Sequence, residues 1–424
     1  MRLLLLTPNP PSPIRVRPYQ LALALVGRGH AVDIACPVAT PREAEDLRRL
    51  SELGLGRVTA PLGRLRRAAN LAAAVASPPP LQARYAWSPA LAEALDAAID
   101  RAAAEGRPYD LVQVEHLRGS AYAPALAARL PLVWDSVDCI SDLFAQTRLL
   151  ARSLRARLMA TLELERTRRL EGRLVARLHH LAVTAETDRA ALLALRVRHL
   201  LRTSPPGAGT DTAAADAATR PDIRVIPNGV DPTRFAACDP AAREPATILF
   251  SGKLSYHANA AAARSLLEAI MPRVWAERPE ARLLLAGAEP PRALRRLAEA
   301  DPRVTVTGYV EDLRACLCRA SLAVAPLTYG VGIQNKVLEA MASATPVVAS
   351  PVAARALGAR PDRELLLGED AEAMARQIQA LLDDPQRAAA LGRAGRDYVA
   401  EHHGWGSAAA SFEGLYASAI QAAG

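Results

Sequence analysis

Apolar residues along this chain alternate between short continuous runs and longer stretches in which they recur at helical spacing. Residues 2–6 are a continuous apolar run, and residues 19–29 carry a helical pattern that ends at Gly27 and Gly29. Residues 31–37 form a second apolar run. A continuous run predicts a strand buried on both faces, as strands of parallel sheets are. The N-terminal segment therefore predicts a strand, a helix and a second, parallel strand.

The same alternation continues through the rest of the chain. Each of nine further segments is predicted to contain a strand, which in some of them fills only the first residues. These segments are residues 109–116, 130–138, 181–193, 223–231, 246–254, 281–289, 304–310, 322–328 and 345–350. Helical patterns lie between them, which predicts parallel sheets with helices on both faces. A chain of 424 residues is too long for one ordinary core. We therefore predict an α/β fold of two Rossmann-like domains, at residues 1–222 and 223–404.

Two segments depart from this alternation. Residues 148–180 are helical and rich in arginine, with leucines at helical spacing. A solvated amphipathic helix is the simpler interpretation, and contact with an anionic membrane surface is the alternative. Residues 202–222 are small, polar and punctuated by glycine and proline, which predicts a flexible insertion.

The net charge of the chain limits the classes of molecule that it could bind, and the length of its apolar runs limits where it could reside. The net charge of +8 and the pI near 9.6 favour an anionic partner, which is a nucleotide, an anionic lipid surface or a nucleic acid. No aromatic-rich or recognition motif supports nucleic acid, so we expect none. The chain has no charge-free apolar run of about 18 residues, and its first run is too short for a signal peptide. We expect a cytoplasmic protein, either soluble or peripheral at the inner face of the cell membrane.

The cysteines give no sign of a metal site. The five are scattered and odd in number, and no histidine pairs with them at zinc spacing. We expect small buried thiols in a reducing compartment.

The most informative stretch is residues 328–350, where a glycine-spaced loop leads into a helix and then a buried strand. Glycines allow the backbone to approach a ligand closely, and a helix N-terminus favours an anion through its free N–H groups and dipole. Lys336 adds positive charge in the first turn, and Glu339 lies on the same face. This combination suits the diphosphate and the ribose of a nucleotide sugar. The residues that lead into the helix are Gly330, Gly332, Ile333, Gln334 and Asn335.

The placement of the lysines supports a phosphate site. Only Lys253 and Lys336 are lysines, so the other 50 of the 52 basic residues are arginines. Lysine is a compact point charge that is not equivalent to arginine at a phosphate. Both lysines stand in predicted loops able to hold phosphate, Lys253 within the stretch FSGKL. Chance placement is the alternative interpretation.

Three residues in the N-terminal half are further candidates. His116 stands at the carboxyl end of the predicted strand DLVQVE, the edge of a parallel sheet where ligands bind. It has either a role at the reacting sugar or acceptor, or a structural hydrogen bond. Glu115 is the alternative candidate there. Arg17, in the predicted loop after the first strand, is a candidate for binding donor phosphates or an acidic acceptor.

Several motifs together resemble the GT-B glycosyltransferases, most closely the retaining enzymes of family 4. They occur in the family's order as VIPNGVDPTRF, FSGKL, LLLAGAE, VTVTGYVEDL and GIQNKVLEAMASATPVVAS. The match is dense over the C-terminal half and looser over the N-terminal half. GIQNKVLEAMA is also similar to glycosyltransferases of bacterial exosortase and exopolysaccharide loci.

The resemblance implies two domains facing each other across a cleft, with the donor on the C-terminal domain and the acceptor on the N-terminal one. The segment 405–424 would be a helix that packs back onto the first domain. The activity implied is metal-independent transfer, with retention, from a UDP- or GDP-linked sugar to a saccharide or lipid-linked acceptor in cell-surface polysaccharide or glycoconjugate biosynthesis. No cofactor is implied.

Residue roles follow from the matching motifs. Glu339 matches the glutamate that binds the ribose hydroxyls, and Val310 the position that contacts the base through its main chain. Lys253, after Gly252, stands where an arginine that binds the diphosphate is usual. Residues 332–336 would supply backbone amides and charge to the same diphosphate. His116, Lys253 and Lys336 are thereby the predicted catalytic residues, and each lysine is expected to contribute about 2–4 kcal/mol to the transition state.

Two departures from the family pattern bear on the donor site. Val331 stands where a second glutamate is usual, eight residues before Glu339, which leaves recognition of the sugar hydroxyls unassigned. The usual lysine a few residues after GKL is also missing. His257, Asn259 or the charge of Lys336 are the candidates to replace it.

Other functions fit the sequence less well. A dinucleotide dehydrogenase needs G-x-G-x-x-G after a strand, and the first predicted strand leads into TPNPPSP instead. A nucleotide-sugar epimerase would bind the same donor without an acceptor. A non-catalytic paralogue that binds a nucleotide sugar is the alternative from another class, and the missing glutamate is its best support.

Overall fold

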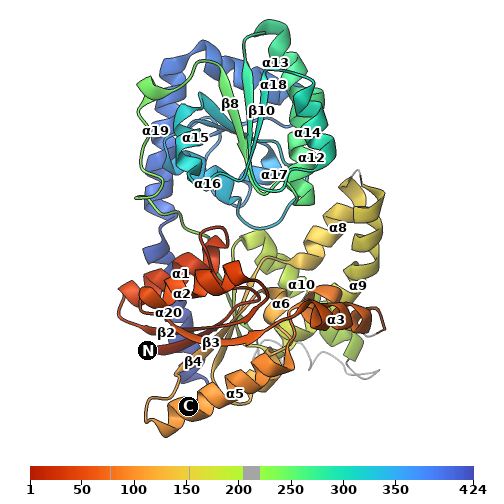
Figure 1. Cartoon of the computed structure of the whole chain (residues 1–424), viewed down its shortest axis with the longest axis vertical. Helices are drawn as coiled ribbons and strands as arrows, with labels where there is room; N and C mark the ends of the chain where they lie inside the picture. The colour runs from red at the N-terminus through yellow and green to blue at the C-terminus, as the bar shows by residue number, and fades with distance from the viewer. Residues whose placement is uncertain (77, 152, 204–219) are drawn as a thin grey trace. The chain divides into compact units, whose positions relative to one another are not determined.

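The computed structural model describes the chain of 424 residues except residues 77, 152 and 204–219. Contacts between Cα atoms divide it into two compact units (Figure 1). Unit 1 contains Met1–Ala145, Met159–Pro227 and Trp405–Gly424, and unit 2 contains Gln146–Leu158 and Asn228–Gly404. Most of the insertion predicted at residues 202–222 lies outside the described residues.

Unit 1 is built on a seven-stranded sheet in which every pair of neighbours is parallel. Its strands are β1 (Arg2–Leu6), β2 (Ala31–Val38), β3 (Gly56–Pro61), β4 (Leu111–Glu115), β5 (Leu132–Val137), β6 (His180–Val183) and β7 (Asp222–Val225). They lie in the order β3-β2-β1-β4-β5-β6-β7. The direction of winding therefore changes between β1 and β4.

The continuous apolar run of β1 is explained by cores on both faces of this sheet. Leu3 and Leu5 pack in one core, and Leu4 and Leu6 pack in the other. The first core is closed by α1 (Val16–Gly27), α2 (Pro41–Glu52) and α20 (Trp405–Gln421). The second is closed by α5 (Pro89–Ala104), α7 (Ala123–Ala127), α9 (Leu154–Arg177) and α10 (Glu186–Thr203). The C-terminal helix α20 contacts α1 and strands β4 to β6 of unit 1.

The structure differs from the sequence prediction at several elements of unit 1. β3 was not predicted, because it is an edge strand whose inner residues alternate between exposed and buried. β7 pairs with β6 in the first sheet, whereas residue 223 was predicted to begin the second domain. The helical region predicted at residues 148–180 consists of the end of α8 (Ile140–Leu150) and of α9. The remaining helices of the unit are α3 (Arg64–Ala76), α4 (Leu81–Tyr85) and α6 (His116–Gly119).

Unit 2 carries a second parallel sheet, of six strands in the order β10-β9-β8-β11-β12-β13 (Figure 1). The strands are β8 (Thr247–Ser251), β9 (Arg282–Ala286), β10 (Val304–Gly308), β11 (Leu322–Ala325), β12 (Val347–Ala349) and β13 (Leu366–Leu367). Here the winding changes direction between β8 and β11. The two-residue β13 was not predicted.

Helices flank the sheet of unit 2 and close one continuous core around it. They are α12 (His257–Ser265), α13 (Met271–Glu277), α14 (Arg292–Glu299), α15 (Leu313–Arg319), α16 (Asn335–Ala342), α17 (Pro351–Ala354), α18 (Ala371–Asp383) and α19 (Pro385–His402). A π-helical turn at Leu266–Ile270 joins α12 to α13, and Pro240–Ala242 form a 3₁₀ turn.

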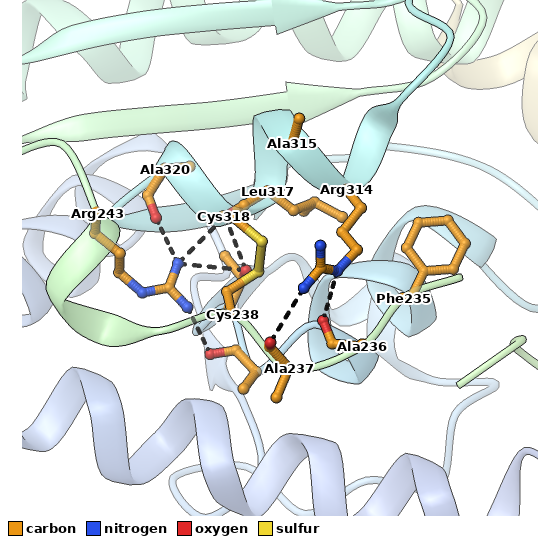
Figure 2. Close-up of a disulfide and its surroundings, with 12 residues drawn as sticks. Phe235, Ala236, Ala237, Cys238, Arg243, Arg314, Ala315, Leu317, Cys318 and Ala320 are labelled. Carbon is orange, nitrogen blue, oxygen red and sulfur yellow. Dashed lines mark hydrogen bonds between the residues drawn. A yellow bond between two sulfur atoms is a disulfide. The ribbon is translucent and has the colours of Figure 1, made fainter. Parts of the chain in front are cut away.

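A disulfide joins Cys238 to Cys318 across a sequence separation of 80 residues (Figure 2). The expectation that all cysteines are free thiols is therefore wrong for this pair. Arg314 brings the two segments together, because its guanidinium donates hydrogen bonds to the carbonyls of Ala236 and Ala237 (2.9 and 3.3 Å). Such tertiary contacts have no signal in cysteine spacing. Cys36, Cys139 and Cys316 are free.

Within the parts of the chain that the structure describes, no helix combines the length and the apolar character needed to cross a membrane.

Candidate functional site

In open parallel sheets, ligands bind at the carboxyl ends of the strands, where the winding changes direction. In unit 2 this point lies between β8 and β11. Gly252 and Lys253 follow β8 directly, and the loop after β11 leads to Gly332 and α16. The sheet topology therefore brings together the two loops in which the sequence placed the donor site.

Glycine is required where the loop after β8 meets the loop after β9. Gly252 has φ +142°, and its carbonyl oxygen lies 1.8 Å from where a Cβ on Gly287 would stand. A Cβ on Gly252 itself would lie 3.1 Å from Cε of Lys336. Any side chain at these two positions would push the loops apart. Glycine thus allows Lys336 to lie against the backbone after β8.

Lys336 is held in place by Asn259, near the start of α12. Its Nζ donates a hydrogen bond to Oδ1 of Asn259 at 2.7 Å, and Nδ2 of Asn259 donates to the carbonyl of Lys253 at 3.0 Å. Burial lowers the pKa of Lys336 to about 8, although the nearby Glu339 raises it. Of the candidates for the missing lysine, Asn259 is the one that the structure places beside Lys336.

Glu339 lies one turn along α16 from Lys336 and is half-buried. Burial raises its pKa to about 7, against the opposing effects of Arg234 and Lys336. Among the described residues, its carboxylate has no hydrogen-bond or ion-pair partner. A half-buried carboxylate without a partner costs free energy unless a ligand satisfies it, so this group is suited to receive hydroxyl donors.

Lys253 takes a different position from Lys336. Its Nζ lies 3.1 Å from Oε2 of Glu289, and the two side chains are 60 and 63% exposed. Only its backbone carbonyl joins the hydrogen-bond chain of Lys336. The two lysines therefore lie in neighbouring loops but in different surroundings.

The other predicted donor residues differ in what their side chains do. Gly332 has φ +63°, and the side chain of Ile333 packs in the core. Gln334 donates to the carbonyl of Val331 at 3.3 Å. Asn335 accepts a hydrogen bond from Asn228 at 2.9 Å, which ties α16 to the turn that precedes β8 in the chain. These residues can therefore offer a ligand mainly backbone N–H groups.

Two predicted positions remain outside this cluster. Val310 follows β10 and is half-buried, with β9 between its strand and β8 in the sheet. Val331 is buried at the usual place of the second glutamate. Two residues earlier in the chain, the Tyr329 hydroxyl and Nδ1 of His257 are 2.9 Å apart and the two rings stack. His257 therefore interacts with Tyr329, which the sequence did not single out.

Unit 1 has polar residues at the equivalent edge of its own sheet. Arg17, predicted in a loop, lies in the first turn of α1 and forms two hydrogen bonds to the carboxylate of Asp135, at 2.8 and 2.9 Å. Their side chains are 5 and 1% exposed. Arg17 also donates to the carbonyl of Ile226 at 3.0 Å and lies over the ring of Phe412. This arrangement favours a structural role over the predicted contact with phosphate.

Glu115 and His116 lie at the carboxyl end of β4. Burial and the charge of Asp135 raise the pKa of Glu115 to about 8, so its carboxyl group is protonated at neutral pH. His116 has φ +61°, a left-handed conformation that costs free energy for a residue with a Cβ. Burial and the charge of Arg118 lower the pKa of its imidazole to about 3. His116 is therefore neutral at neutral pH.

The hydrogen bonding of His116 fixes which nitrogen carries the proton. Its Nδ1 accepts the backbone N–H of Arg118 at 3.2 Å. In a neutral ring the other nitrogen, Nε2, must then be protonated and able to donate. His116 can offer one N–H to a ligand but no positive charge.

Asp138, at the end of β5, is a further acidic residue that the sequence prediction missed. Its carboxylate accepts a hydrogen bond from Thr184 at 2.9 Å, and burial raises its pKa to about 6. The signal was available in the motif LPLVWDSVD, because Asp135 and Asp138 end a predicted strand as His116 does. No group of three or more side chains able to hold a metal ion occurs in the described part of the chain.

Comparison with known families identifies one segment of the chain. Residues 245–384 match the family described as "Glycosyl transferases group 1". The match is to this segment and not to the whole chain. The group 1 segment contains β8 to β13 and both lysines, so it includes Gly252, Asn259, Lys336 and Glu339 of the donor-site cluster described above.

Two curated relatives match about two fifths of the chain. One is a GDP-mannose-dependent monoacylated alpha-(1-6)-phosphatidylinositol monomannoside mannosyltransferase of Corynebacterium glutamicum, 31% identical over 206 residues, or 44% of this chain and 54% of that protein. The other is a phosphatidyl-myo-inositol mannosyltransferase of Mycolicibacterium smegmatis, 32% identical over 182 residues, or 41% and 46%. The chain thus spans about half the length of these relatives.

Solved structures show the fold of the chain. A sucrose-phosphate synthase from Thermosynechococcus elongatus has a TM-score of 0.68 at 20% identity, with 99% of both chains covered. Anabaena HepE in complex with UDP-glucose has a TM-score of 0.66 at 13% identity, covering 99% of this chain and all of that one. The predicted GT-B fold is confirmed. The family 4 assignment and the exosortase-associated subgroup stay predictions.

Proposed function

We propose that the protein is a glycosyltransferase that moves a sugar from a nucleoside-diphosphate sugar to a saccharide or lipid-linked acceptor. The observation that carries the proposal is the cluster at the change of winding in unit 2. There, helix α16 carries both Lys336 and Glu339. Lys336 is half-buried beside a glycine-lined loop, and the Glu339 carboxylate has no partner among the described residues. The group 1 family of this segment supports the same conclusion.

The cluster is suited to a departing nucleoside diphosphate. Negative charge develops on the diphosphate as the bond to the sugar breaks, and preorganised positive groups stabilise it. Lys336 supplies the charge, Asn259 orients it, and the first turn of α16 adds backbone N–H groups. Glu339 then accepts hydrogen bonds from the ribose hydroxyls. In the proposed reaction the nucleotide sugar is a co-substrate, UDP- or GDP-linked, and no further cofactor takes part.

Unit 1 supplies the proposed acceptor side. The neutral imidazole of His116 donates its Nε2 proton in a hydrogen bond to a hydroxyl of the transferred sugar or of the acceptor. Transfer with retention at the sugar carbon follows from the resemblance to family 4 and is part of the proposal. The curated relatives are named for phosphatidylinositol and its mannosides, which favours a lipid acceptor and a place in cell-surface glycoconjugate biosynthesis.

A lipid acceptor implies work at a membrane surface, and α9 offers a means of contact. Leu154, Leu158 and Leu162 recur every four residues along this helix and are 78, 63 and 61% exposed. Exposed arginines stand among them, at residues 155 and 157. Apolar side chains between basic ones favour the surface of an anionic bilayer. We therefore propose a peripheral position on the membrane.

A transfer assay tests this function. The protein is incubated with labelled GDP-mannose or UDP-glucose and with vesicles containing phosphatidylinositol, and label in the lipid fraction and free nucleotide are measured. We expect transfer from one donor and loss of transfer in Lys336→Met. Bound nucleotide without transfer or donor hydrolysis, across both donors, would identify the non-catalytic paralogue instead. The one-bond carbon–proton coupling constant at the anomeric carbon of the product, measured by NMR, tests retention.

A further inference from the structure

Unit 1 contains a large apolar cavity that is lined by none of the residues assigned above to sugar transfer. It has a volume of about 660 Å³ and lies between α4, the α6–α7 segment and the C-terminal half of α9. Trp87, Pro124, Leu170, Leu174 and Leu178 form much of its wall. A cavity of this size and lining is typical of a small-molecule site.

Among the described residues that line this wall, the charged side chains are all arginines. Arg84, Arg173 and Arg177 line the cavity, and none of the described lining residues is acidic. Among the described residues, none of the three has a carboxylate within ion-pair distance. In this chain many exposed arginines pair with acidic neighbours, as Arg168 does with Glu165 at 2.9 Å. Three unpaired arginines at one apolar cavity therefore indicate a place for negative charge.

A second, smaller cavity adjoins the first through Arg173. It has a volume of about 210 Å³, lies between α9 and α10, and is lined by the side chains of five arginines, with Glu165 as its single acidic residue. The carboxylate of Glu165 is already shared between Arg168 and Arg198. The formal charge of these lining side chains is thus five minus one, or +4, with His199 neutral.

The pKa of His199, which lines the smaller cavity, reflects this concentration of positive charge. Burial lowers the pKa of His199, and the charges of Arg173, Arg177 and Arg202 lower it further. Arginines whose charges disfavour a proton on His199 would attract an anion. A phosphate group fits this geometry well, because arginine binds phosphate through parallel N–H donors.

From these two adjoining cavities we infer that unit 1 binds a single phosphate-headed lipid. Its hydrocarbon chain occupies the apolar cavity beside Trp87 and Leu174, and its phosphate lies on Arg173 and the neighbouring arginines. An uncharged apolar ligand would leave the arginines without an anionic partner, and inorganic phosphate would leave the 660 Å³ cavity unfilled. The inference needs no sugar donor, so it stands or fails apart from the proposed transfer.

Calorimetry with lipids in monomeric form tests this site separately from general adhesion to a bilayer. The full chain is titrated with dioctanoyl phosphatidylglycerol below its micelle concentration, with dioctanoyl phosphatidylcholine, and with glycerol 3-phosphate as the head alone. We expect the anionic lipid to bind at least tenfold more tightly than either comparison compound. The double variant R173E/R177E should lose this preference. The variant R292E/R296E, with two exposed arginines at the same spacing on α14, should keep it.

A second variant tests the apolar half with all charges intact. Ala127→Trp, at an exposed position of the cavity wall, should weaken lipid binding at least tenfold and leave glycerol 3-phosphate unaffected. Vesicles with brominated acyl chains should quench the fluorescence of the protein, and Trp87→Phe should remove most of that quenching. The other three tryptophans, Trp134, Trp275 and Trp405, do not line this cavity.

Several results would overturn the inference. Equal affinity for both lipids would remove the role of the arginines, and equal affinity for glycerol 3-phosphate would leave an anion site without a lipid. Absence of binding, or normal binding by folded R173E/R177E and by Ala127→Trp, would also contradict it. Self-association in sedimentation that R173E/R177E abolishes would show that a second copy of the chain occupies the surface.

Discussion

The two lysines of the chain should differ sharply in their contribution to catalysis. The sequence alone gave them equal weight, but the structure separates them. Lys336 is half-buried and oriented by Asn259, whereas Lys253 is 60% exposed and paired with Glu289. We expect Lys336→Met to impair transfer far more than Lys253→Met.

The magnitude follows from the surroundings of each charge. Two unit charges about 4 Å apart interact by roughly 4 kcal/mol at the effective dielectric of a partly buried site, and by roughly 1 kcal/mol in bulk water. Lys336→Met should therefore reduce kcat/KM by about 10²- to 10³-fold, the range seen when one preorganised donor is removed. Lys253→Met should reduce it about fivefold or less, because exposed ion pairs contribute little.

Steady-state kinetics with saturating acceptor measures both variants, and thermal unfolding serves as the control for folding. Lys336→Met should keep the melting temperature, because it removes a charge whose pKa burial has lowered and which the fold therefore does not favour. The reasoning is refuted if Lys253→Met is the more damaged enzyme, or if a folded Lys336→Met turns over at the wild-type rate.

Three further predictions follow from the same structure. Nucleotide affinity should be highest between about pH 7 and 8, because Glu339 protonates below this range and Lys336 loses its charge above it. Calorimetry should show that the loss of affinity below pH 7 disappears in Glu339→Gln. Glu115→Gln should leave stability unchanged near pH 4 and raise it above pH 8, by at most about 5 kcal/mol. The folded pKa of Glu115 is raised, so between about pH 4.5 and 8 the wild type binds more protons than its unfolded chain and loses stability as pH rises. Replacing Cys238 and Cys318 together by serine should lower the stability of unit 2 by about 2–4 kcal/mol in denaturant titrations, because the bond closes a long loop.

These further predictions can also fail in distinct ways. An affinity that does not change across this pH range would show that neither charge meets the nucleotide. A Glu115→Gln protein that loses as much stability as the wild type between about pH 4.5 and 8 would place the titration elsewhere. Unfolding midpoints that are equal with and without reductant would show that the disulfide contributes nothing.

The sequence predicts the strands that are buried on both faces and misses those at the edges. β1 is a run of apolar residues because two cores surround it, so its composition alone identifies it. β3 is half-exposed with polar residues among its apolar ones, and β13 has two residues, so neither has an apolar run long enough to identify a strand. Strand β7 was recognised as a strand, but which sheet it joins depends on pairing with β6, for which the sequence has no signal.

The candidate site shows a similar division. Lys336 and Glu339 could be found because their roles depend on helical spacing, which the sequence contains. The pairing of Arg17 with Asp135, 118 residues apart, depends on the sheet bringing α1 next to β5. Burial then decides the state of each group, and for that reason the neutral His116 could not be foreseen.

Nucleotide binding tests the central claim most directly. Thermal unfolding of the wild type and of Glu339→Ala is followed with UDP, GDP, ADP, dTDP, CMP and NAD. A ligand at about 100 times its dissociation constant stabilises a protein by roughly 2.7 kcal/mol, a shift of several degrees in Tm. The account predicts a rise with one nucleoside diphosphate that Glu339→Ala abolishes. No rise with any nucleoside diphosphate, or a rise with NAD alone, would contradict it.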